Sequence, residues 1–302
     1  MYTGYGPRAR RGKQEVDMAQ AQFVEGTTAT GAPWRIGYQV CGAGEDVLLL
    51  HGGGPGATGA SNYSKNIEAL SRHFRCWVID FPGWGSSSKN LNAFGGLGPF
   101  QNGSRAVLAF MDALGLARAH LVGNSFGGSA ALCLAMDAPE RAGKLVLMGP
   151  GGGVVAGAKG PTEGIKQLLT YYLGEGPTPQ KLQAFIGNLV HDPSLITPEL
   201  IRLRYEASND PEIRANPPLL PPPGGPGPET FISLDPRLAS VPNRTLFIWG
   251  LQDRVNLVAG LEPFKVMPQA DYLLLSRCGH WAQWEHPQRF NDVVTSFLLH
   301  DS

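Results

Sequence analysis

A short stretch, VGNSFGGSAA over residues 122–131, sets a serine among glycines. It contains the pattern G-x-S-x-G, which follows the apolar run Ala119–Val122 and precedes a run of small residues. At a sharp strand-to-helix turn, glycines relieve crowding and the serine hydroxyl can project as a nucleophile. The N–H groups of the following helix then face developing negative charge. The pattern predicts Ser125 as a nucleophile and the N–H of Phe126 as an oxyanion donor.

A serine nucleophile needs a base and a group that orients the base. Asp253 and His280 each come shortly after an apolar run, and the chain order Ser, Asp, His is the one used with a nucleophile elbow. Asp235 and Asp271 compete for the role of the acid, and Asp253 could instead close an Asx turn. The spacing favours a triad of Ser125, Asp253 and His280.

A glycine-rich loop, HGGGPG over His51–Gly56, directly follows the apolar run Asp46–Leu50. Such a loop can hold phosphate, but the Lys-Ser/Thr pair of a P-loop is missing here. After an early strand, the loop instead matches the segment that supplies a second oxyanion N–H group. We therefore predict Gly53 as the second oxyanion donor.

Short apolar runs that suit buried strands recur along the chain. Helical patterns separate some of them, at Ser104–Leu116, at Gly128–Met136 and at the closing segment Pro287–Leu299. This alternation predicts an α/β fold, a mostly parallel central sheet with helices on both faces. The six predicted strands are Asp46–Leu50, Cys76–Asp80, Ala119–Val122, Lys144–Met148, Arg244–Trp249 and Asp271–Leu275.

The alternation breaks between Gly151 and Val241. This part has helical patterns at Thr162–Leu173, Pro179–Val190 and Thr197–Ser208, then the Pro/Gly run Pro217–Pro228, which can neither pair as a central strand nor continue a helix. The predicted organisation is a flexible tail over residues 1–22, a core domain over residues 23–150 and 242–302, and an inserted helical cap over residues 151–241.

Composition excludes several classes of partner. The chain has 302 residues, with 25 basic and 25 acidic side chains, so no strong charge would attract nucleic acid or anionic lipid. No apolar run is long enough to span a membrane. The four scattered cysteines favour reduced thiols over disulfides, and no spacing indicates a metal or other cofactor. The basic N-terminus lacks the apolar segment of a secretory signal, and a cytoplasmic protein is expected.

Several motifs together resemble the meta-cleavage product hydrolases of the α/β-hydrolase superfamily, from about Gly31 to Leu299. They are HGGGPGATGASN, GNSFGG, LMGPGG, DPSLITPELIRLRYEAS, IWGLQDRVN and CGHWAQWEHP. The resemblance implies an α/β-hydrolase fold, hydrolysis of a carbon–carbon bond in a dienoate from aromatic ring cleavage, and a homo-oligomer. It also implies that the substrate site is lined by Gly53, Gly54, Asn62, Asn124, Ser194, Arg204 and Trp281.

The planar fork of Arg204 suits the substrate carboxylate, although Arg202 is an equal candidate by composition. Without the resemblance, Asn62 and Ser194 could equally be helix-capping or turn residues.

Two departures from the family stand out. Ala60 occupies a position where many relatives have Trp, which would widen the pocket wall, and the run Pro217–Pro228 is not a family feature.

Two other functions remain open on the sequence. A serine carboxylesterase would use the same triad, and it would hydrolyse simple aryl esters much faster than any dienoate. A non-catalytic small-molecule receptor could have kept the fold, although the presence of all three triad residues disfavours it. The sequence leaves open whether Ser125 attacks the substrate carbonyl itself or activates a water molecule.

Overall fold

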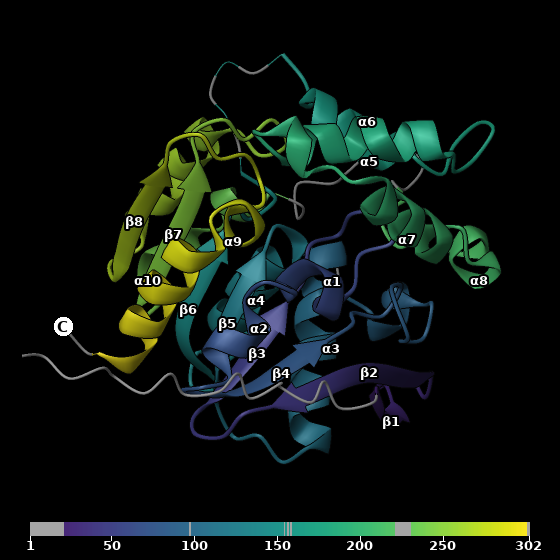
Figure 1. The fold of residues 1–302 in the computed structure, drawn as a ribbon. Coiled ribbons are helices and arrows are strands. Elements are labelled where there is room, and N and C mark those ends of the chain that lie inside the picture. Colours follow the sequence, from purple (N-terminus) through teal and green to yellow (C-terminus); the bar gives the residue numbers. More distant parts are fainter. Residues whose placement is uncertain are drawn as a thin grey trace, which may run out of the picture.

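An eight-stranded sheet organises the part of the chain that the computed structural model describes, which is residues 21–96, 98–153, 155, 157, 159–220 and 231–300. The strand order is β1-β2-β4-β3-β5-β6-β7-β8 (Figure 1). Strands β3 to β8 pair in parallel, while β1 and β2 pair antiparallel at one edge. The strands are β1 Gln22–Thr27, β2 Pro33–Cys41, β3 Asp46–Leu50, β4 Arg75–Ile79, β5 Ala119–Asn124, β6 Ala142–Met148, β7 Thr245–Gly250 and β8 Ala270–Leu275.

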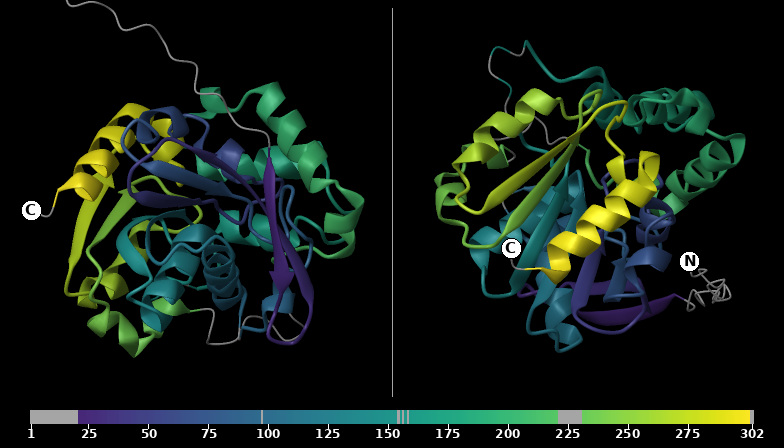
Figure 2. Two further views of the ribbon diagram at one scale, coloured as in Figure 1. Left: turned by 90° about the horizontal axis from the view of Figure 1, so that it is seen from below. Right: turned by 60° about the vertical axis from the view of Figure 1, so that its left-hand side comes forward.

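Helices cover both faces of the sheet (Figure 2). Alternate residues of one strand point to opposite faces, so Leu48 packs in one apolar cluster with α3 (Pro99–Ala113) and α4 (Phe126–Asp137). Its neighbour Val47 packs in a second cluster with α2 (Ile67–Leu70) and α10 (Pro287–Leu299). The short helices α1 (Gly59–Tyr63) and α9 (Ala282–Glu285) and the 3-10 helices η1 (Leu91–Phe94) and η6 (Val258–Val266) complete the layers. The predicted α/β fold is confirmed.

All six predicted strands are present, with ends that differ by at most two residues. The antiparallel strands β1 and β2 were not predicted, because their half-exposed faces leave no continuous apolar run. Residues 1–20 of the predicted tail lie outside the described residues, and Gln22 already belongs to β1. The helix predicted from Ser104 begins instead at Pro99, with Gly98 as its N-cap, and Ser104 is buried inside it.

In the described part of the connection from β6 to β7, four α-helices lie across the end of the sheet at which the parallel strands finish (Figure 1). Threonines 162, 178 and 197 cap the first three by accepting backbone N–H groups. Part of the predicted cap packs in the core instead: η4 (Ile232–Leu234) and η5 (Pro236–Ser240) bury Ile232 and Leu238 beside α4. Residues 221–228 of the Pro/Gly run lie outside the described residues. The four helices are α5 Glu163–Thr170, α6 Pro179–Leu189, α7 Pro198–Ser208 and α8 Pro211–Ala215.

None of the helices in the described ranges is both long and apolar enough to cross a membrane.

Candidate active site

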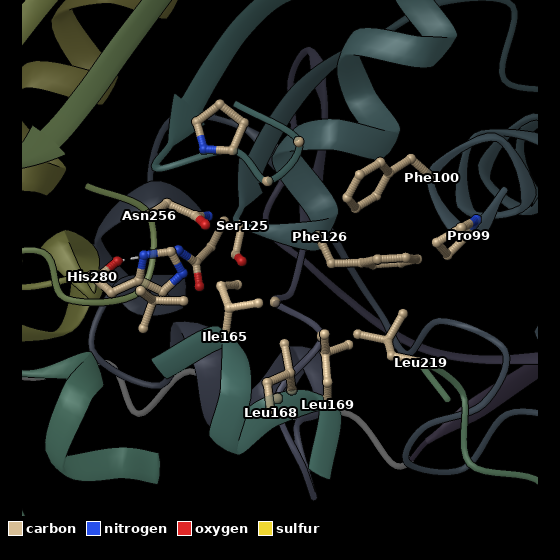
Figure 3. Close-up of a pocket in the computed structure, with 18 of the residues that line it drawn as sticks. Pro99, Phe100, Ser125, Phe126, Ile165, Leu168, Leu169, Leu219, Asn256 and His280 are labelled. Atoms are coloured by element: carbon tan, nitrogen blue, oxygen red, sulfur yellow. Dashed lines mark hydrogen bonds between the residues drawn. The ribbon is translucent and has the colours of Figure 1, made fainter. Parts of the chain in front are cut away.

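Ser125 lies at the bend between β5 and α4, with φ of 50° and ψ of −113°. Non-glycine residues rarely adopt this backbone conformation, which costs about 1–3 kcal/mol. Two glycines allow the bend: a Cβ atom at Gly123 would lie 2.6 Å from the backbone of Gly127, and one at Gly127 would lie 2.2 Å from the carbonyl oxygen of Leu50. The bend points the Ser125 side chain into a cavity beneath the helices that follow β6 (Figure 3).

His280 and Asp253 form a buried pair beside this serine. The Nδ1 atom of His280 lies 2.7 Å from Oδ2 of Asp253, and both side chains are almost fully enclosed. The other carboxylate oxygen of Asp253 accepts the backbone N–H groups of Val255 and Asn256. Because Asp253 is held from two sides, it fixes the imidazole with its Nδ1 proton toward the carboxylate. Nε2 is then left to exchange protons within the cavity.

The competing acids lie elsewhere. Asp235 is bound to Arg237, and the exposed Asp271 lies 3.7 Å from Arg244. Both pair with arginines, whereas Asp253 is the acid that hydrogen-bonds the His280 imidazole.

The two predicted oxyanion donors also lie close together. Phe126 is the first residue of α4, where backbone N–H groups have no partner within the helix. A Cβ atom at Gly53 would be 3.2 Å from the Cβ of Phe126, so the two backbones meet next to Ser125. This arrangement can supply two N–H donors to one oxygen.

Ser125, His280 and the two predicted oxyanion donors line one cavity of about 920 Å³. Figure 3 shows Ser125 between His280 on one side and Phe126 on the other. The cavity wall includes Gly53, Gly54, Asn62, Asn124, Arg204 and Trp281 of the predicted substrate residues.

Arg204 is a buried cation on this wall, with 3% of its surface exposed. Its Nε donates to the carbonyl of Pro55 at 2.8 Å, and its Cζ lies 5.4 Å from the ring centroid of Trp281. No acidic side chain of the described residues forms an ion pair with it. Burial lowers the pKa of Arg204 to about 10, against the opposing effect of Tyr172 and Tyr171. A buried, unpaired guanidinium is a ready site for a carboxylate.

The other candidate arginine is fully occupied at the surface. Arg202 binds Glu199 at 2.7 Å and Glu206 at 2.8 Å on the exposed side of α7. These acidic groups raise the pKa of Arg202 above its ordinary value.

Three further residues position the backbone around Arg204 and Ser125. The Oδ1 of Asn62 accepts the N–H of Gly52 at 2.9 Å. The Nδ2 of Asn124 donates to the carbonyl of His280 at 3.3 Å, while its buried Oδ1 has no hydrogen-bond partner among the described residues. A Cβ atom at Gly54 would be 3.0 Å from Nη2 of Arg204, so a glycine lets the guanidinium approach the loop.

Two expectations need correction. Ser194 is exposed in a 3-10 turn (Pro193–Leu195) and does not line the cavity, because Asp192 caps this turn at the surface. Ala60 also lies away from Ser125. It lines a separate pocket beside Asp80 and Glu206, so a small residue there does not widen the cavity wall.

Sequence reasoning missed part of the wall. Leu168 and Leu169 of α5 and Phe185 of α6 line the cavity, as does Leu219 of the Pro/Gly run. Apolar residues at helical spacing in α5 and α6 were a signal for burial, but nothing in the pattern distinguished a cavity wall from packed core.

Known families and proteins resemble this chain over most of its length. A family model described as the alpha/beta hydrolase fold matches residues 46–287. A 2-hydroxy-6-oxononadienedioate/2-hydroxy-6-oxononatrienedioate hydrolase from Burkholderia vietnamiensis is 40% identical, over 93% of this chain and 96% of its own length. The chain belongs to the α/β hydrolases, among the meta-cleavage product hydrolases.

Solved structures agree with this placement. A meta-cleavage product hydrolase from Pseudomonas fluorescens IP01 matches with a TM-score of 0.79 and 31% identity, over 93% of this chain and 97% of the other. The 2-hydroxy-6-oxo-6-phenylhexa-2,4-dienoate hydrolase from Rhodococcus sp. strain RHA1 matches with a TM-score of 0.73 and 27% identity, over 93% of this chain and all of the other (100%).

Proposed function

We propose that the chain hydrolyses a carbon–carbon bond in a 2-hydroxy-6-oxohexa-2,4-dienoate from aromatic ring cleavage. The products are 2-hydroxypenta-2,4-dienoate and a carboxylic acid. The observation that carries the proposal is the buried Arg204, which has no acidic partner among the described residues and lies on the same wall as Ser125. A simple esterase has no use for such a cation, whereas a dienoate brings a carboxylate to pair with it.

Cleavage needs an electron sink, because the bond that breaks joins two carbons. Ketonisation supplies one: the 2-hydroxyl loses its proton, C5 gains a proton, and the double bonds shift to give a 2-keto acid. His280 carries this proton, since its Nδ1 is fixed by Asp253 and its Nε2 is free to exchange. Arg204 holds the C1 carboxylate during the transfer.

Cleavage begins at the C6 carbonyl. Either the Ser125 hydroxyl or a water molecule that it positions adds to C6, while His280 takes the proton released. The negative charge on the C6 oxygen is stabilised by the N–H groups of Gly53 and Phe126. The C5–C6 bond then breaks, and its electron pair moves through C4 and C3 to the C2 oxygen. His280 returns the proton to give the dienol product. If Ser125 is the nucleophile, it now carries the acyl group as an ester, and a water molecule activated by His280 hydrolyses this ester to release the carboxylic acid.

The test is a stopped-flow absorbance assay with a synthetic dienoate and with an aryl ester that has no carboxylate. We expect the dienoate chromophore to disappear with formation of the carboxylic acid, and a much lower kcat/KM on the ester. Fast ester hydrolysis with an unchanged dienoate would indicate a carboxylesterase instead. Binding of the dienoate without turnover would indicate a receptor.

Two further properties belong to the same proposal. The four cysteines are free thiols, three of them buried, which supports a location in the reducing cytoplasm. The family resemblance supports a homo-oligomer. Light scattering on the purified chain tests the second property, and a monomer at micromolar concentration would contradict it.

A further inference from the structure

Charged side chains are unevenly distributed around the cavity at Ser125. Apart from the histidine of the catalytic pair, Arg204 is the one charged side chain among the described residues that line it. Figure 3 shows apolar side chains over much of the remaining wall, which runs from Ser125 past Phe126 and Phe100 to Leu219. Leu168 and Leu169 of α5 cover the same space.

Three polar side chains in this wall are bonded to the protein itself. Asn102 accepts the N–H of Gly96 at 2.6 Å and donates to Asn92 at 3.3 Å. Thr162 donates to the carbonyl of Val255 at 2.7 Å, and Asn256 donates to the carbonyl of Gly149 at 2.8 Å. None of these groups carries a charge that could balance a second anion.

One cation lies in a neighbouring stretch: Lys159 precedes the lining residue Gly160, but its side chain is exposed and does not line the cavity. Positions 97, 154, 156, 158 and 221–230 contain no Lys, Arg or His. A second carboxylate on the substrate would therefore enter a wall of neutral groups, with Arg204 already engaged by the C1 carboxylate. Burying an ionised carboxylate without a partner costs several kcal/mol.

We infer that the substrate of this chain carries a neutral hydrocarbon on C6, of aryl size or larger, and that a carboxylate-terminated distal group is rejected. The inference rests on the proposed function. It separates this chain from the 40% identical relative, whose name specifies a dienedioate with an acid group at each end. The size follows from the cavity, since about 920 Å³ is near the upper end of the roughly 300–1,000 Å³ typical of small-molecule sites.

A panel of dienoates on the wild-type chain tests the inference directly. The distal groups are phenyl, 2-carboxyethyl, and the 2-carbamoylethyl amide that matches the acid in length without its charge. We expect kcat/KM for phenyl to exceed that for carboxyethyl by about a hundredfold or more, with the amide in between. Equal or better turnover of the carboxyethyl compound would overturn the inference and leave the proposed function intact. If no member of the panel is cleaved, the proposed function itself fails.

A charge placed in the wall gives a second test. Leu169→Arg introduces a cation beside the distal group, and we expect the carboxyethyl-to-phenyl ratio of kcat/KM to rise at least tenfold. The matched control is Leu203→Arg on the exposed face of α7, which should leave the ratio unchanged because Leu203 does not line the cavity. A folded Leu169→Arg variant with an unchanged ratio would contradict the inference. If this variant does not fold, the wild-type panel still decides.

Discussion

The guanidinium of Arg204 lies over the indole of Trp281, the residue that directly follows His280 in the chain. The cavity wall thus places a carboxylate anchor from α7 against the segment that carries the base. Arg204 is held there by an aromatic face and the Pro55 carbonyl, neither of which neutralises its charge. This leaves the charge available to a substrate.

Replacing Trp281 with leucine should weaken this anchor. A cation–π contact is worth about 0.5–2 kcal/mol, so KM for the dienoate should rise roughly twofold to thirtyfold. The aryl ester, which has no carboxylate, should be much less affected. Steady-state kinetics on both substrates measure the difference, and an equal rise in both KM values would point to general disruption of the wall.

Two substitutions at Ser125 separate its chemistry from its strain. Ser125→Ala should lower the turnover of the dienoate by several orders of magnitude, as the loss of a triad nucleophile does. Ser125→Gly should be equally inactive but more stable than Ser125→Ala, by about 1 kcal/mol, because glycine tolerates φ of 50°. Urea unfolding of both variants checks the second part. Near-normal dienoate turnover in either variant would exclude Ser125 as nucleophile or activator.

His280→Ala should stop both ketonisation and cleavage, because one imidazole moves the proton in each step. Rapid mixing with the dienoate follows the two steps by the separate absorbance of the dienol and the ketone. Normal ketonisation without cleavage would show that another group moves the first proton.

Arg204→Met should make the empty protein more stable while it removes dienoate activity. Burial lowers the pKa of Arg204 to about 10, so below that pH the folded chain holds this proton less tightly than the unfolded chain does. The resulting destabilisation is fully present at neutral pH and disappears only as pH rises through and above 10. Removing the charge should raise the free energy of unfolding by about 1–2 kcal/mol at pH 7. Lower stability of the variant in urea would show that the Pro55 hydrogen bond outweighs the cost of burial.

The sequence could single out Ser125, Asp253 and His280 as a candidate triad because each of them follows a strong local signal. Ser125 has its glycines, and Asp253 and His280 each follow the end of an apolar strand. Strand β3 begins and ends at the residues predicted from its unbroken apolar run, and it is buried on both faces.

Other features depend on tertiary contacts that no local pattern encodes. Ser194 matched a family motif, but whether a turn faces the cavity or the solvent depends on how the helices after β6 pack. Arg202 and Arg204 are alike in composition, and only their positions on α7 separate the surface ion pairs from the cavity. Strands β1 and β2 pair with each other, but many of their residues are exposed. Their sequences therefore contain no apolar run that predicts these strands.

The most direct test of the account compares Arg204→Ala with Arg202→Ala on a dienoate and on a neutral aryl ester. Arg204→Ala should lower kcat/KM for the dienoate by roughly thirtyfold to a thousandfold, since losing one partner of a buried charge pair costs about 2–4 kcal/mol. The ester should lose little, and Arg202→Ala should be nearly silent on both substrates because Arg202 lies at the surface. Equal losses for dienoate and ester in Arg204→Ala, or a large loss in Arg202→Ala, would contradict the role of Arg204 as the carboxylate anchor.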